Sequence, residues 1–68
     1  MPHYFFHLCG RISAHDVRGH ECADDAEARE HGDFIAHRIG TEKPGLVQDG
    51  NYVSVCDATV LEIARFPL

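Results

Sequence analysis

Residues 52–66 read YVSVCDATVLEIARF, and this stretch decides the fold. Two segments rich in β-branched and aromatic residues, Tyr52–Cys56 and Val60–Phe66, flank a short polar loop, a pattern typical of a β-hairpin. A three-residue loop at 57–59 keeps apolar residues opposite one another, whereas a two-residue loop would place valine opposite glutamate. The predicted cross-strand pairs are Val55–Leu61, Val53–Ile63, Ser54–Glu62, Cys56–Val60 and Tyr52–Ala64.

A helix over Asp24–Gly40 is the second predicted element. Asp24 is suited to cap its first turn, with Glu27 three residues on as the reciprocal partner of a capping box. Gly40 is a natural residue just past a helix end, and Pro44 prevents continuation. Small and apolar residues at helical spacing form one stripe, which comprises Ala28, Gly32, Ile35 and Ile39.

Gly32 is an unusual member of that stripe, because glycine costs a helix interior up to about 1 kcal/mol relative to alanine. Its position predicts that an aromatic side chain of the sheet packs very close to the helix there. The stripe is expected to cover the apolar hairpin face, which carries Val53, Val55, Leu61 and Ile63.

The N-terminal segment Tyr4–Leu8 is aromatic-rich and predicts another strand. Residues 11–14 (Arg11 to Ala14) favour a short return strand, and residues 16–22 favour a loop or a weak edge strand. Alternation places Tyr4, Phe6 and Leu8 in the core. The fold class is therefore α+β, a ββαββ arrangement in which residues 1–68 form one small domain with one helix packed on one face of an antiparallel sheet.

The opposite sheet face is left uncovered, since one helix covers only one face. This face is too apolar to be simply a solvent-exposed surface, and exposed apolar patches of this kind mark interaction surfaces. Aromatic residues dominate interface energetics, so Phe5, Tyr52 and Phe66 are the expected anchors. The residues expected on this face are His3, Phe5, His7, Cys9, Tyr52, Ser54, Cys56, Val60, Glu62, Ala64 and Phe66.

The opening octapeptide MPHYFFHL (residues 1–8) resembles the start of a family of short bacterial proteins of unknown function, which commonly open MP-x-YFFH. The resemblance implies a small cytosolic α+β domain and supplies no activity. This chain departs from the family at residues 57–59, where the usual hairpin is longer and contains glycine, and at Cys9 and Cys56. The resemblance continues as spaced single residues through Asp16, Gly19, Glu21, Asp24, Asp25, Ala28, Val53, Val55 and Asp57.

Composition excludes several classes of partner. The 68 residues carry six Lys and Arg against eleven Asp and Glu, a net charge of −5, which disfavours a nucleic-acid partner. No apolar run approaches the roughly 20 residues that span a bilayer, so no membrane association is expected. Three cysteines are an odd number without a CxxC motif, which favours reduced thiols in the cytoplasm. No small-molecule substrate is indicated.

Histidines and cysteines suggest an alternative, a zinc-binding protein. His7 and Cys9 lie at positions i and i+2 of a strand and therefore share a face, as Cys56 is expected to do. These three residues would supply three zinc ligands, with His3 or water as the fourth. The competing interpretation is surface histidines and small buried thiols, because the spacing matches no zinc-site pattern.

Catalysis is not expected. The carboxylates Asp16, Glu21, Asp24 and Asp25 flank a loop and a helix start, where capping explains them, and no catalytic motif is present. The sequence therefore favours a non-catalytic module that binds another protein or a second copy of itself. Protonation of all six histidines would change the net charge from −5 to +1, so self-association should depend on pH between about 5 and 7.

Overall fold

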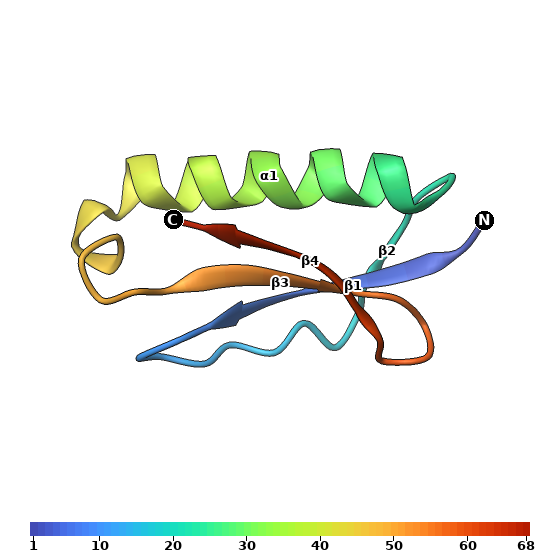
Figure 1. Ribbon diagram of the computed structural model, residues 1–68, viewed down its shortest axis with the longest axis horizontal. Helices are drawn as coiled ribbons and strands as arrows, with labels where there is room; N and C mark the ends of the chain where they lie inside the picture. The colour runs from blue at the N-terminus through green and yellow to red at the C-terminus, as the bar shows by residue number, and fades with distance from the viewer.

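The computed structural model describes residues 1–68, with the helix in one layer and the strands in a second (Figure 1). The sheet has the order β2-β1-β3-β4, and every neighbouring pair is antiparallel. The predicted α+β fold class is confirmed. The elements are β1 (His3–Cys9), β2 (His20–Glu21), α1 (Asp25–Glu42), the 3₁₀ helix η1 (Pro44–Leu46), β3 (Tyr52–Cys56) and β4 (Glu62–Pro67).

The central strands β1 and β3 carry the core on the face that α1 covers. Phe6 stands opposite Val55 and Leu8 opposite Val53, so the predicted face is correct for both, although Leu8 is half-buried and does not join the core cluster. Tyr4 is 3% exposed, and Phe6 packs against the core from its edge. The buried core cluster comprises Tyr4, Cys22, Ala28, Ala36, Val53 and Val55.

The start of α1 follows the prediction and its end does not. Asp24 Oδ1 accepts a hydrogen bond from the Glu27 N–H at 2.9 Å, which confirms the cap. The Glu27 carboxylate accepts from the N–H of Ala23 at 3.0 Å. The helix runs two residues beyond Gly40, because the Lys43 N–H still donates to the Ile39 carbonyl before η1 begins.

Gly32 marks the closest approach of α1 to the sheet. A Cβ added to Gly32 would lie 2.5 Å from Cγ2 of Val55 and 3.0 Å from Cε2 of Phe66. Both distances are shorter than ordinary van der Waals contact. The predicted close packing of an aromatic residue is therefore confirmed, and the residue is Phe66.

The predicted register of the β3–β4 hairpin is wrong. Cys56 pairs with Glu62, and after an irregularity Val55 pairs with Ala64. The closing contact joins the Asp57 N–H to the Leu61 carbonyl at 2.9 Å, so the loop is 58–60. The pairing of Cys56 with Glu62 instead of Val60 is a shift of two positions, which leaves each side chain on its predicted face. The extra residue of the bulge then moves every later side chain of β4 to the opposite face.

The bulge moves Phe66 to the helix side of the sheet. Phe66 stands opposite the buried Val53 and packs against the core beside α1. Ala64 moves to the core with it, and neither belongs to the uncovered face as predicted. Leu61, expected in the core, is 63% exposed because it closes the loop.

The segment between β1 and α1 also differs from the prediction. The return strand expected over residues 11–14 is a single bridge, in which Leu8 and Ala14 exchange two backbone hydrogen bonds of 2.9 Å. The regular strand is β2, within the segment expected to be loop or weak edge strand, and it pairs with His3 and Tyr4 of β1. No helix is long and apolar enough to cross a membrane.

Candidate interaction surface

One face of the sheet is not covered by α1, and we call it the open face. Two connections, residues 10–19 and the hairpin loop at 58–60, lie on this side of the sheet and form its rim (Figure 1). The strand register assigns to the open face Phe5, His7 and Cys9 of β1, Tyr52, Ser54 and Cys56 of β3, and Glu62 and Arg65 of β4.

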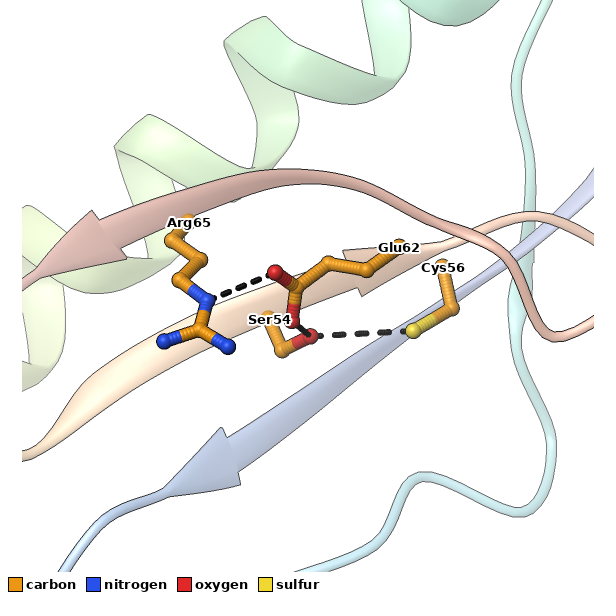
Figure 2. A network of polar contacts seen from close by, with 4 residues as sticks. All are labelled: Ser54, Cys56, Glu62 and Arg65. Atoms are coloured by element: carbon orange, nitrogen blue, oxygen red, sulfur yellow. Dashed lines mark hydrogen bonds and ion pairs between the residues drawn. The ribbon is translucent and has the colours of Figure 1, made fainter.

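A polar network occupies the half of the open face over β3 and β4. Ser54 is 4% exposed although no helix covers it, because Glu62 lies between Ser54 and Arg65 (Figure 2). The Ser54 hydroxyl donates to Glu62 Oε2 at 2.5 Å, and Arg65 Nε donates to Glu62 Oε1 at 2.6 Å. The hydrogen bond from Ser54, followed by that from Arg65, holds the pKa of Glu62 below its usual value.

The guanidinium of Arg65 completes this network on its other side. Its Cζ lies 4.7 Å from the ring centroid of Tyr52, within the range of a cation–π contact. The hydrogen bond and charge of Glu62 raise the pKa of Arg65. The charges in this half of the face are therefore internally paired.

A hollow of approximately 410 Å³ occupies the other half, over β1 and the rim. Its volume falls in the range of ligand pockets, about 300–1,000 Å³. The exposed surface inside it is mostly apolar, which distinguishes it from the polar network beside it. The hollow is lined by Phe5, His7, Cys9, His15, Cys56, Asp57 and Val60.

Aromatic rings form one wall of the hollow. Phe5 and His7 stack with ring centroids 6.3 Å apart, and His7 meets His15 edge to face at 5.2 Å. His7 Nδ1 accepts a hydrogen bond from the Asp16 N–H at 3.0 Å, which places the proton of the neutral ring on Nε2. This hydrogen bond fixes the ring orientation and ties the rim to β1.

Asp16 organises the rim behind that wall. Its carboxylate accepts hydrogen bonds of 3.2, 3.1 and 3.0 Å from the N–H groups of Phe6, Arg18 and Gly19. Burial raises the pKa of Asp16, but these donors outweigh burial, so its pKa lies below the usual value. Asp16 thus acts as a structural acceptor within the rim.

Asp57 organises the hairpin loop on the opposite side of the hollow. Its Oδ1 accepts from the N–H and hydroxyl of Thr59 at 2.9 and 2.7 Å and from the Leu61 N–H at 3.0 Å. The hydroxyl hydrogen bond from Thr59 is the largest cause that lowers the pKa of Asp57. Within this loop Val60 has φ = 69°, the only positive φ among the non-glycine residues.

Val60 lies on the uncovered face as predicted, whereas the sequence analysis did not place His15 or Asp57 there. An aspartate two residues before a threonine is a signal of a side-chain-stabilised turn, which would have located Asp57. The sequence does not predict a left-handed backbone conformation at Val60, because valine is among the residues least suited to a positive φ. The contribution of His15 depends on the path of residues 10–19.

Two of the three predicted anchors lie on the open face. Phe5 lines the hollow, and Tyr52 lies beside it under Arg65. Phe66 does not, because the β4 bulge turns it toward α1. The interaction role of Phe5 and Tyr52 stays a prediction, while the face predicted for Phe66 is wrong.

The predicted zinc ligands share the hollow without forming a metal site. His7, Cys9 and Cys56 all line it, yet no three His, Cys, Asp or Glu side chains are grouped so that they would hold a metal ion. Cys56 pairs with Phe5, four residues from Cys9 along β1, a separation of about 13 Å. The suggested fourth ligand, His3, has Nε2 hydrogen-bonded to the Arg18 carbonyl at 2.6 Å.

The acidic residues before α1 have structural roles. Asp25 Oδ1 accepts a hydrogen bond of 2.6 Å from the Tyr4 hydroxyl, which joins the helix start to β1. This hydrogen bond, followed by burial, raises the pKa of Tyr4 to about 12. Asp24 caps the helix. Neither carboxylate faces the hollow.

Comparison with known proteins identifies the chain by family alone. Residues 3–68 match a family model described as "Domain of unknown function (DUF6894)". No curated protein and no solved structure matches the chain.

Proposed function

Because the chain belongs to DUF6894, a family without an assigned activity, its function must be inferred from its surface, and we propose a small non-catalytic protein-interaction module that forms a homodimer through the open face. The observation that carries the proposal is the apolar hollow on that face. An apolar depression beside a paired polar network resembles the apolar core and polar rim of protein interfaces.

The face, rather than an edge of the sheet, is the proposed contact. The edge strand β2 has two residues, and β4 is bulged at its start and ends at Pro67, which has no N–H to donate. Short, bulged or proline-containing edges resist the addition of a strand. The contact is therefore expected to use side chains, with Phe5 and Tyr52 among them.

A second copy of the chain is the proposed occupant because the face is charge-balanced. A surface that meets its own copy across a two-fold axis must avoid an excess of one sign. The rim and hairpin, residues 10–19 and 57–65, carry three acids and three bases, so the net charge of −5 resides elsewhere. These residues are Asp16, Asp57, Glu62, Arg11, Arg18 and Arg65.

The arrangement gives less support to the two alternatives, zinc binding and catalysis. Cys9 and Cys56 stand too far apart to share one ion, and His7 Nδ1 is already an acceptor. The carboxylates Asp16, Asp24 and Asp25 each accept a hydrogen bond that organises the fold. We also propose the bacterial cytoplasm as the compartment, since three free thiols suit a reducing environment.

Native mass spectrometry of untagged protein, purified without chelator, tests the proposal. The expected result is twice the chain mass with no added mass. A single-chain mass at about 100 µM, well above the Kd range of stable dimers, would overturn the homodimer. Added mass that EDTA removes would instead support zinc.

Two substitutions then locate the contact. The Phe5→Ser/Tyr52→Ser double variant is expected to dissociate while retaining its circular dichroism spectrum and a cooperative melt. Phe34→Ser is the matched control, because Phe34 is 59% exposed on α1, in the opposite layer. If Phe34→Ser dissociates the dimer and the double variant does not, the open face is not the interface.

A further inference from the structure

Val60 adopts a backbone conformation that its side chain opposes. Its φ of 69° lies in the left-handed region, where a β-branched residue is a genuine outlier. Such strain persists only where the surrounding structure enforces it, and it concentrates at functional sites. The side chain of Val60 is 80% exposed, so burial within the monomer does not compensate for the strain.

The loop geometry shows which residue this position favours. The Val60 N–H donates to the Asp57 carbonyl at 3.0 Å, and Asp57 and Leu61 close the loop at 2.9 Å. A three-residue hairpin loop of this type ends in a left-handed residue, which is usually glycine. The three hydrogen bonds to Asp57 Oδ1 hold the turn closed around the valine.

The strained residue stands at the rim of the hollow. Val60 lines the hollow, and its neighbour Leu61 is 63% exposed. The hairpin loop therefore presents the exposed Val60 at the hollow, and the exposed Leu61 follows it in the chain. An exposed apolar side chain and an apolar recess on one face are mutually complementary.

We propose that Val60, with Leu61, is the anchor of the homodimer, and that the hairpin tip of each copy packs into the hollow of the other. This inference rests on the proposed function and adds the residues that make the contact. A two-fold interface is isologous, so one protruding tip and one recess per copy satisfy both sides at once.

The dimensions of the open face suit a second copy. The sheet plane contains the longest and the shortest axes of the molecule (Figure 1), whose extents of 34 and 17 Å give a footprint of about 580 Å². A standard interface takes about 800 Å² of accessible surface from each partner. A contact of this class would therefore use the whole open face, including its charge-balanced rim.

Val60→Gly tests the inference because the two roles of the residue predict opposite effects. Removing the strain should raise Tm by about 4–8 °C at a concentration where the wild type is dissociated. Removing the apolar side chain should weaken dimerisation at least about tenfold in analytical ultracentrifugation. Val60→Asn should behave likewise, since asparagine tolerates the left-handed region.

Leu61→Ala separates the two effects. It removes apolar surface from the tip without relieving strain, so it should weaken the dimer without raising Tm. Phe34→Ser, on the opposite layer, should leave the dimer unchanged.

Three outcomes would overturn distinct parts of the inference. A monomeric wild type would contradict the proposed homodimer, on which the inference rests. A dimeric wild type whose Val60→Gly variant dimerises unchanged would contradict only the role of Val60 as anchor. A lower Tm for Val60→Gly would contradict the proposed backbone strain at Val60.

Discussion

The ring of Phe66 lies against the backbone of Gly32, where a Cβ would approach Cε2 of the ring to 3.0 Å. The same Cβ would stand 2.5 Å from Cγ2 of Val55, a fully buried side chain. The helix therefore sits at a depth that only glycine permits, and this depth brings β4 under α1.

Gly32→Ala is expected to destabilise the domain although alanine is the better helix former. Helix propensity favours alanine by up to about 1 kcal/mol, whereas overpacking a tight contact costs about 1–3 kcal/mol. The Val55 backbone cannot move away from the added methyl group, since β3 is hydrogen-bonded to β1 on one side and to β4 on the other. We expect a net loss of about 1–2 kcal/mol in the free energy of urea unfolding.

Gly40→Ala is the matched control in the same helix. A Cβ at Gly40 would stand 3.5 Å from Cγ2 of Val47, an ordinary contact. This variant should be neutral or more stable by up to about 1 kcal/mol. Equal losses in the two variants would show that helix position, not close packing, governs both.

Tyr4 should ionise unusually late in alkaline titration. Its hydrogen bond to Asp25 and its burial raise its pKa to about 12, two units above the usual value of 10.0. Because the unfolded chain releases this proton more readily, the stability contributed by Tyr4 is present below pH 10 and is lost as pH rises toward 12. Ultraviolet absorbance should show a late tyrosinate transition that Tyr4→Phe abolishes, and its persistence in that variant would contradict the assignment.

His31 should make stability depend on pH below neutrality. Burial, followed by the neighbouring charge of His20, lowers its pKa from the usual value of 6.5, and the two rings stack with centroids 4.5 Å apart. The unfolded chain then binds the proton more readily, so this stability is present above pH 6.5 and is lost as pH falls through the depressed value.

Urea midpoints between pH 7.5 and 5.5 measure this dependence. The midpoint should fall with pH in the wild type and fall less in His31→Gln. His20→Gln should also reduce the fall, because the ring that repels a charge on His31 is gone. An unchanged pH slope in both variants would assign the dependence to other groups.

Self-association should depend on pH between about 5 and 7. Protonation of six histidines changes the net charge from −5 to +1, which reduces long-range repulsion, but that repulsion is screened beyond about 8 Å at physiological salt. Sedimentation profiles at pH 5.5 and 7.5 should differ, and identical profiles would contradict the prediction.

The sequence predicted those features that local chemistry determines. Asp24 and Glu27 indicated where the helix begins, and Gly32 indicated its closest contact with the sheet. Alternation along β1 placed Tyr4 and Phe5 on opposite faces, so the sequence indicated which side chains of β1 lie on the uncovered face.

The features that escaped prediction depend on backbone irregularity. One extra residue in β4 changed the side on which Phe66 lies, and no residue type signals such a bulge in Glu62–Pro67. Val60 occupies a conformation that its own chemistry disfavours, so propensity pointed away from the residue that the structure singles out. Most of the residues that line the hollow were predicted on the uncovered face, and those missed are His15 and Asp57 of the connecting loops.

The edges of the sheet set a limit on assembly. With β2 only two residues long and β4 bounded by a bulge and Pro67, the edges of the sheet resist lateral stacking of copies. In the proposed homodimer each copy uses its open face once. Growth is therefore expected to end at a closed pair, and crowding should raise the population of that pair without seeding filaments.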